Sequence, residues 1–191
     1  MFEVNIDLFN PALPALEEVK GFVESDGYIS IEAESFTGKT DRGNSGWHII
    51  EGLGRSGNSV TVLPAKTASV EKVKKILNNS PSLEYDIYTF TEGEASLELR
   101  CSPSYPINNE YGLRIALAID DETPRIVEAE KKGDVMYNLK KIITELNPGK
   151  PGRHTLKLWM VDPGLVIDKI IIDLGGVRES YLGPPESPCY K

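Results

Sequence analysis

The sequence predicts an all-β fold, an antiparallel β-sandwich with one or two short helices in its connections. Short segments in which apolar and polar residues alternate recur along the chain, and Pro, Gly or Asn residues separate them. Helical spacing of apolar residues occurs in only two stretches, which do not alternate regularly with the strands. Parallel βαβ architectures are therefore disfavoured, and the recurring short strands favour a sandwich.

The chain of 191 residues corresponds to one domain, because an average domain contains about 150 residues. Residues 1–20 contain two prolines and an acidic pair, Glu17 and Glu18. We expect this segment to be a linker or the tail of a preceding domain, and the folded unit to begin at Gly21.

Period-two alternation defines the strands in order along the folded unit. They are predicted at residues 28–34, 47–50, 58–63, 83–90, 94–100, 113–119, 125–128, 154–161 and 165–172. The alternation is clearest at 94–100 and 113–119, where the apolar residues align on one face. Helices are predicted at 67–79 and 133–147, where apolar residues recur three or four positions apart.

The charge balance restricts the partners of the protein. The chain carries 21 basic and 29 acidic residues, a net charge of −8, with a pI of about 4.9. This field repels a phosphate backbone, so nucleic acid and anionic membrane surfaces are not expected partners, whereas a neutral glycan is not penalised. No apolar run approaches the roughly 20 residues that span a bilayer, and the N-terminus shows no secretory signal.

The chain has two cysteines, Cys101 and Cys189, which lie far apart in the sequence. Two cysteines are too few for a disulfide framework or a cysteine-rich zinc site. We expect both to be free thiols, and a single long-range disulfide is the alternative.

The segment from Gly52 to Gly57 has the glycine spacing of a dinucleotide-binding fingerprint. That fingerprint requires a helix after its third glycine, but here a β-branched segment follows and ends at Pro64. The glycines are therefore predicted to form a turn between two strands. No catalytic residue is predicted, because His48 and His154 lie at unrelated positions and no Gly-x-Ser-x-Gly elbow accompanies them.

Glu32 and Glu34 share one face of a predicted strand, because side chains on a strand repeat every second residue. Two carboxylates this close repel each other unless a cation or a basic residue lies between them. Calcium, which takes about six to eight oxygen ligands, is one such cation, and solvated surface acids are the alternative. A second acidic group, residues 120–122, precedes Pro124 and predicts a turn.

Trp47 and Trp159 are the only tryptophans of the chain, and both lie in predicted strands. An exposed indole can stack on the apolar face of a sugar ring, and burial in the core is the alternative. Trp159 lies opposite Leu156 in the alternation, so we expect it to face outward or toward a second layer. With Tyr28 and Asp120, the two tryptophans form the predicted ligand-binding set.

Several strings of the sequence are similar to one known family. The two most specific are Trp-Met-Val-Asp-Pro-Gly at 159–164 and Tyr-Leu-Gly-Pro-Pro-Glu-Ser at 181–187. Further agreement lies at residues 27–36, 46–47, 52–64, 83–85, 118–122, 152–158 and 169–173. Together they resemble the C-terminal domain of glycoside hydrolase family 115, the xylan α-1,2-glucuronidases. The resemblance covers residues 21–187 and leaves 188–191 as a C-terminal tail.

The resemblance implies a jelly-roll β-sandwich similar to carbohydrate-binding modules of families 6 and 35. In those modules, acids at the positions matching Glu32, Glu34 and Asp168 help to hold a structural calcium ion. The catalytic acids of the family belong to an upstream barrel domain. The resemblance therefore implies no catalytic residue in this chain and no enzyme activity of the chain by itself.

Two functions are compatible with the resemblance. The first is an accessory module that binds xylan of the plant cell wall. Neutral stretches of xylan are then preferred over acidic branches, because few basic residues lie near the tryptophans. The second is an interaction domain that binds no sugar and packs on the catalytic domain or forms a homodimer. In either case we expect the parent enzyme to act outside the cytoplasm, in the extracellular space or the periplasm.

Overall fold

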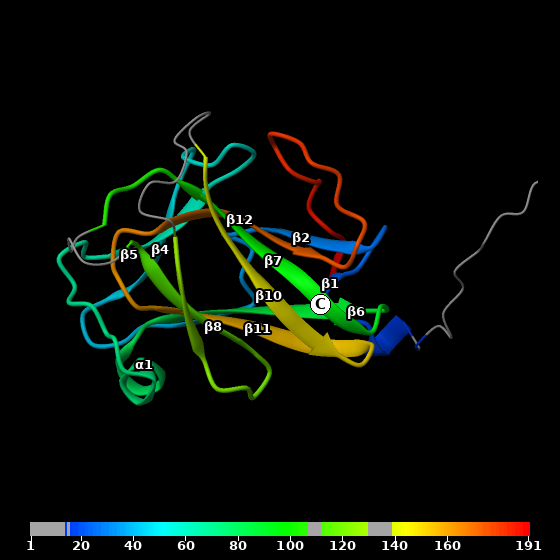
Figure 1. Ribbon diagram of the computed structural model, residues 1–191, viewed down its shortest axis with the longest axis horizontal. Helices are drawn as coiled ribbons and strands as arrows, with labels where there is room; N and C mark the ends of the chain where they lie inside the picture. The colour runs from blue at the N-terminus through cyan, green and yellow to red at the C-terminus, as the bar shows by residue number, and fades with distance from the viewer. Residues whose placement is uncertain (1–13, 15, 107–111, 130–138) are drawn as a thin grey trace, which may run out of the picture.

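The protein is described here by a computed structural model, which covers residues 14, 16–106, 112–129 and 139–191. Two β-sheets pack face to face, with buried apolar side chains between them (Figure 1). The predicted antiparallel β-sandwich is confirmed, and each of the predicted strands is present. A short 3-10 turn, η1 (Leu16–Glu18), precedes the sandwich.

The first sheet, sheet A, has seven strands in the order β13-β1-β6-β11-β8-β9, with β3 paired to β6. Its strands are β1 (Gly21–Val23), β3 (Gly38–Thr40), β6 (Ser82–Thr89), β8 (Arg114–Ile119), β9 (Arg125–Glu128), β11 (Gly152–Met160) and β13 (Cys189–Tyr190). The pairing of β1 with β6 is parallel, and the other pairs are antiparallel.

The second sheet, sheet B, has six strands in the order β10-β7-β12-β5-β4, with β2 paired to β12. Its strands are β2 (Tyr28–Glu32), β4 (Gly46–Ile50), β5 (Ser59–Leu63), β7 (Gly93–Ser102), β10 (Lys140–Gly149) and β12 (Val166–Asp173). Alternate side chains of both sheets fill the common core, with Leu97 of β7 and Leu117 of β8 fully buried. The two most regular alternations of the sequence thus lie in opposite sheets.

The helix predicted at 67–79 is present only in its second half, as α1 (Val73–Asn79). The helix predicted at 133–147 is wrong where the structure describes it, because residues 140–149 form strand β10, which pairs with β7. Ile142 and Leu146 are buried while Ile143 is 62% exposed. The helical spacing joined Ile143 to Leu146, whereas the strand buries Ile142 with Leu146, which are four positions apart and so fit one face of a strand. Residues 133–138 lie outside the described part of the chain.

Helix α1 adds a second apolar layer on the outer face of sheet A (Figure 1). Ile76 of α1 is fully buried and packs with Trp159, Ala116 and Ala118. The two alanines face outward from β8, and their small side chains leave room for the indole ring. The prediction that Trp159 faces outward or toward a second layer is confirmed.

The segment after β12 crosses the outer face of sheet B before it reaches β13, and is drawn in red in Figure 1. The buried Arg100 side chain donates hydrogen bonds to the carbonyl oxygens of Ser180 and Tyr181, each at 3.0 Å. Lys169, also buried, donates to the carbonyl of Pro184 at 3.2 Å. Two cations of sheet B therefore hold this C-terminal segment through its backbone.

No helix within the described ranges is long and apolar enough to cross a membrane.

The second layer gives a stability prediction. We expect Ile76→Ala to lower the free energy of unfolding by about 2–4 kcal/mol, because the cavity left between α1 and Trp159 is only partly refilled. Leu77→Ala is the matched control on the same helix, since Leu77 is 45% exposed, and should change stability by less than about 1 kcal/mol. Urea unfolding followed by tryptophan fluorescence measures both. Equal effects of the two substitutions would contradict the packing of α1 on sheet A.

Candidate functional site

The two tryptophans are buried. Trp47 is 2% exposed and its Nε1 donates a hydrogen bond of 3.2 Å to the carbonyl of Pro81, while Trp159 is 8% exposed beneath α1. The expectation that one of them offers an open ring face to a sugar is therefore wrong. Both indoles fill apolar space, Trp47 between the sheets and Trp159 in the second layer.

Tyr28 and Asp120, the other two predicted ligand residues, lie in different settings. Tyr28 is half-buried and lines a cavity of about 830 Å³ together with Arg178 and the backbone around Gly175. Asp120 does not line that cavity. Its carboxylate accepts a hydrogen bond from the Thr155 N–H at 2.8 Å, so it serves to join the end of β8 to β11. The structure does not bring the four predicted ligand residues into one site.

The structure does bring together the three predicted metal ligands. Glu32, Glu34 and Asp168 form an acid cluster where the end of β2 meets β12, beneath the loop of residues 51–58. The Ser56 hydroxyl donates to Glu32 Oε1, and the Asn58 N–H donates to Glu34 Oε1, each at 2.7 Å. The loop thus binds the acid cluster through its own donors.

Basic side chains already occupy this acid cluster. Arg55 contacts both carboxylate oxygens of Asp168: its N–H donates to Oδ1 at 3.0 Å, and its Nη1 donates to Oδ2 at 2.7 Å. Lys169 Nζ lies 2.9 Å from Glu32 Oε1. Within the described residues, no group of three or more His, Cys, Asp or Glu side chains is arranged to hold a metal ion. As arranged, the cluster does not fit calcium, which requires about six to eight oxygen ligands.

The glycines of the loop are explained by its close approach to these carboxylates. A Cβ atom on Gly54 would lie 2.7 Å from Asp168 Oδ1, and one on Gly57 would lie 2.6 Å from Glu34 Oε1. The loop joins β4 to β5, so the predicted turn between two strands is confirmed. The glycines that resemble a nucleotide-binding fingerprint thus allow the backbone of this loop to approach the acid cluster closely.

A second cavity, the edge cavity, has a volume of about 570 Å³ and lies beside β1 and β13 of sheet A. Phe36 and Tyr190 contribute aromatic rings to its lining, and Asp86 and Arg153 contribute charged groups. Arg153 Nη2 lies 3.0 Å from Asp86 Oδ2, and the Thr155 hydroxyl donates to Asp86 Oδ1 at 2.8 Å. Aromatic rings and planar polar groups therefore meet on one surface.

The edge cavity could not be predicted from the sequence, because its residues come from distant segments of the chain. Asp86 and Arg153 are neighbours only because β6 pairs with β11, and Tyr190 arrives through the pairing of β13 with β1. Alternation predicts that Asp86 faces outward, but it does not predict which strand lies beside it.

Both cysteines are free thiols, as predicted. Cys101 is buried in the core, and burial raises the pKa of its thiol to about 12. Cys189 is exposed and lines the edge cavity. Desolvation, with a further contribution from the Glu186 carboxylate, also raises the pKa of Cys189.

The fold is a β-sandwich similar to that of known carbohydrate-binding modules. A family 6 module from a laminarinase of Zobellia galactanivorans is 18% identical, with a TM-score of 0.51, over 76% of this chain and 98% of the module. The isomalto-dextranase of Arthrobacter globiformis T6 is 10% identical, with a TM-score of 0.53, over 78% of this chain and 24% of the enzyme. At these identities the likeness concerns the fold alone.

The chain belongs to the glycosyl hydrolase family 115 C-terminal domain family, whose sequence model matches residues 21–186. A family 115 4-O-methyl-α-glucuronidase with specificity for decorated arabinogalactans is 16% identical, with a TM-score of 0.49, over 72% of this chain. The matched part is 17% of that enzyme, so the chain spans a small share of its length. No curated protein sequence matches the chain.

The two thiols should differ in reactivity. We expect a maleimide reagent to modify Cys189 but not Cys101 in the native protein, because the thiolate is the reactive form and only Cys189 can be reached. The rate of modification should rise with pH through the neutral range, since the pKa of Cys189 is raised. Mass spectrometry counts the labels, and urea-unfolded protein is the control in which both thiols react. Labelling of Cys101 under native conditions would contradict its place in the core.

Proposed function

We propose that this chain is a non-catalytic accessory domain of a family 115 glycoside hydrolase and that it binds carbohydrate in the edge cavity. The observation that supports this most directly is the meeting of Phe36 and Tyr190 with the Asp86–Arg153 pair on one surface. Sugars present apolar ring faces and polar hydroxyls at once, and a site that binds them needs both kinds of group. A volume of about 570 Å³ falls within the range of small-molecule sites.

The proposed ligand is a neutral stretch of xylan. Asp86 and Arg153 are already paired, so they offer acceptors and donors to hydroxyl groups without an excess of positive charge. Glu186 adds a carboxylate to the lining. With a net charge of −8 over the chain, an acidic sugar is repelled at long range, whereas a neutral one is not.

The role of such a site is to hold an attached enzyme near its polymer. A module that binds weakly by itself raises the effective concentration of the catalytic domain at the polysaccharide surface. Cell-wall polysaccharides lie outside the cytoplasm, so the proposal includes an extracellular or periplasmic location for the parent enzyme.

The second candidate function is an interaction domain without sugar binding. The exposed Tyr181 and Leu182, both on the C-terminal segment, favour it, as does the burial of both tryptophans. In that function the segment packs on a neighbouring catalytic domain or on a second copy of the chain. Binding measurements separate the two functions.

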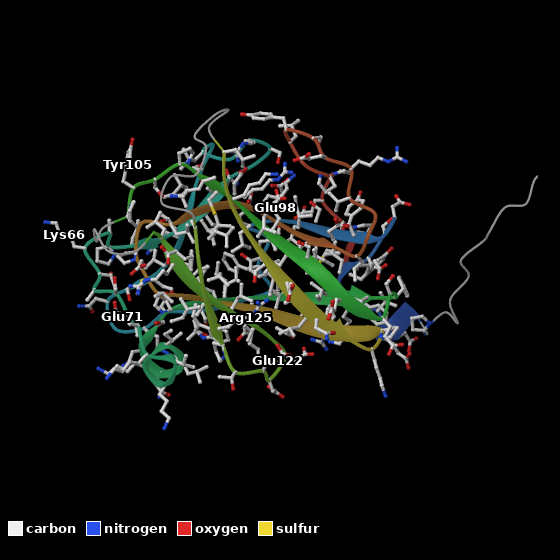
Figure 2. The ribbon with its side chains drawn as sticks, viewed as in Figure 1. Lys66, Glu71, Glu98, Tyr105, Glu122 and Arg125 are labelled. Atoms are coloured by element: carbon white, nitrogen blue, oxygen red, sulfur yellow. The ribbon has the colours of Figure 1, made fainter. Side chains whose placement is uncertain are left out.

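We expect xylooligosaccharides to bind with a Kd in the millimolar range and to shift NMR signals of residues that line the edge cavity. Tyr190→Ala and Arg153→Ala should each weaken binding by about tenfold, because one loses a stacking surface and the other a hydrogen-bonding partner. Tyr105→Ala is the matched control, since Tyr105 projects into solvent outside the cavity (Figure 2). Arabinogalactan oligosaccharides are titrated in a parallel experiment as the alternative ligand. An unchanged spectrum at millimolar concentrations of both sugars would favour the interaction-domain function instead.

We also expect the purified chain to release no 4-O-methylglucuronic acid from xylan oligosaccharides. Glycoside hydrolysis needs two carboxyl groups placed about the scissile bond. In the edge cavity, Asp86 is engaged with Arg153 and Thr155, and Glu186 accepts a hydrogen bond from the Glu32 N–H. Product analysis by chromatography, with an active family 115 enzyme as control, measures this. If the wild-type chain released 4-O-methylglucuronic acid and the Asp86→Asn variant did not, the assignment of the domain as non-catalytic would be wrong.

A further inference from the structure

The acid cluster carries a formal charge of −3 from Glu32, Glu34 and Asp168, and Arg55 and Lys169 bring +2 to it. The side chains of the Arg55–Asp168 pair are 10% and 2% exposed, and that of Lys169 is 3% exposed. Charges removed from water to this degree are stable only when they are paired and hydrogen-bonded. The three carboxylates therefore obtain from Arg55 and Lys169 the positive charge that a bound cation would otherwise supply.

We propose that the Arg55 guanidinium, assisted by Lys169, takes the place of a divalent cation at this position of the sandwich. Arg55 is an internal cation on the loop of residues 51–58, and it ties that loop to β12 through Asp168. The stability of the domain is then independent of calcium.

The geometry of Arg55 supports this role. Two donors of the same residue, a backbone N–H and Nη1, engage the two oxygens of one carboxylate. The guanidinium carbon also lies 5.7 Å from the centroid of the Tyr181 ring, over its face. One side chain thus joins the loop, strand β12 and the C-terminal segment, which are three parts of the chain distant in sequence.

Two carboxylate oxygens of the acid cluster are available to a cation even with Arg55 in place. Glu32 Oε2 and Glu34 Oε2 are buried, and neither has a hydrogen-bond partner within the described part of the chain. Two free oxygens are too few for calcium, but loss of the Arg55 side chain would also free Asp168 Oδ2, while the backbone N–H of residue 55 still donates to Oδ1. The three carboxylates would then offer a latent site for a divalent cation.

Thermal unfolding with excess calcium chloride and with excess EDTA tests the proposal. We expect the same Tm for the wild-type protein in both. Arg55→Ala should lower the Tm in EDTA by about 5 °C or more, because it leaves the buried Asp168 carboxylate without its ion-pair partner. Calcium should raise the Tm of this variant, because an ion that binds only the folded state stabilises it. Arg125→Ala removes an exposed cation whose guanidinium contacts the Thr144 hydroxyl; it is the control, and its Tm should be the same in calcium and in EDTA.

Two results would overturn the proposal. A wild-type Tm that falls in EDTA and recovers in calcium would mean that the cluster holds an ion beside Arg55. An Arg55→Ala variant with one Tm in calcium and EDTA would mean that Arg55 does not stand in for a cation. If Arg55→Ala does not fold, Arg55→Gln keeps most of the side-chain length, loses the charge and carries the same expectation. None of these outcomes depends on whether the edge cavity binds sugar.

Discussion

The pairing of buried charges on sheet B holds together parts of this sandwich that are distant in sequence. Asp168, Lys169 and Arg100 are each almost fully buried, and each has a hydrogen-bonded partner. An unpaired charge at such a depth would cost several kcal/mol, so the partners are obligatory and their positions are fixed. The loop of residues 51–58 and the C-terminal segment therefore lie where these side chains require.

The edge cavity depends on the same interactions, although it lies on the other sheet. The C-terminal segment is held by Arg100 and Lys169 as it crosses sheet B, and the carbonyl of Pro188 then accepts a hydrogen bond from the Val23 N–H. As a result, Tyr190 pairs with β1 and lies in the lining of the edge cavity. The charges on one face of the sandwich thus position an aromatic ring at the edge of the other sheet.

Helix α1 determines which surfaces of sheet A remain open. It covers the outward-facing Trp159, whose exposed indole would otherwise be the most favourable stacking surface for a sugar. Polar strand positions farther along the same sheet, such as Asp86, are not buried beneath it. The cavity proposed for binding therefore lies at the edge of sheet A rather than over its tryptophan.

The sequence by itself determined the strands, the sandwich, the turn at 52–57 and the outward direction of Trp159, because side-chain alternation and turn residues act over short distances. It also placed Glu32, Glu34 and Asp168 together through resemblance to a family. Alternation could not distinguish helix from strand at 140–147, since a spacing of four residues fits both. Only the tertiary structure decided that Arg55 neutralises the acid cluster, that α1 covers Trp159 and that Asp86 meets Arg153. Such contacts depend on which strands pair and how layers pack, and these are set by the whole chain rather than by any local pattern.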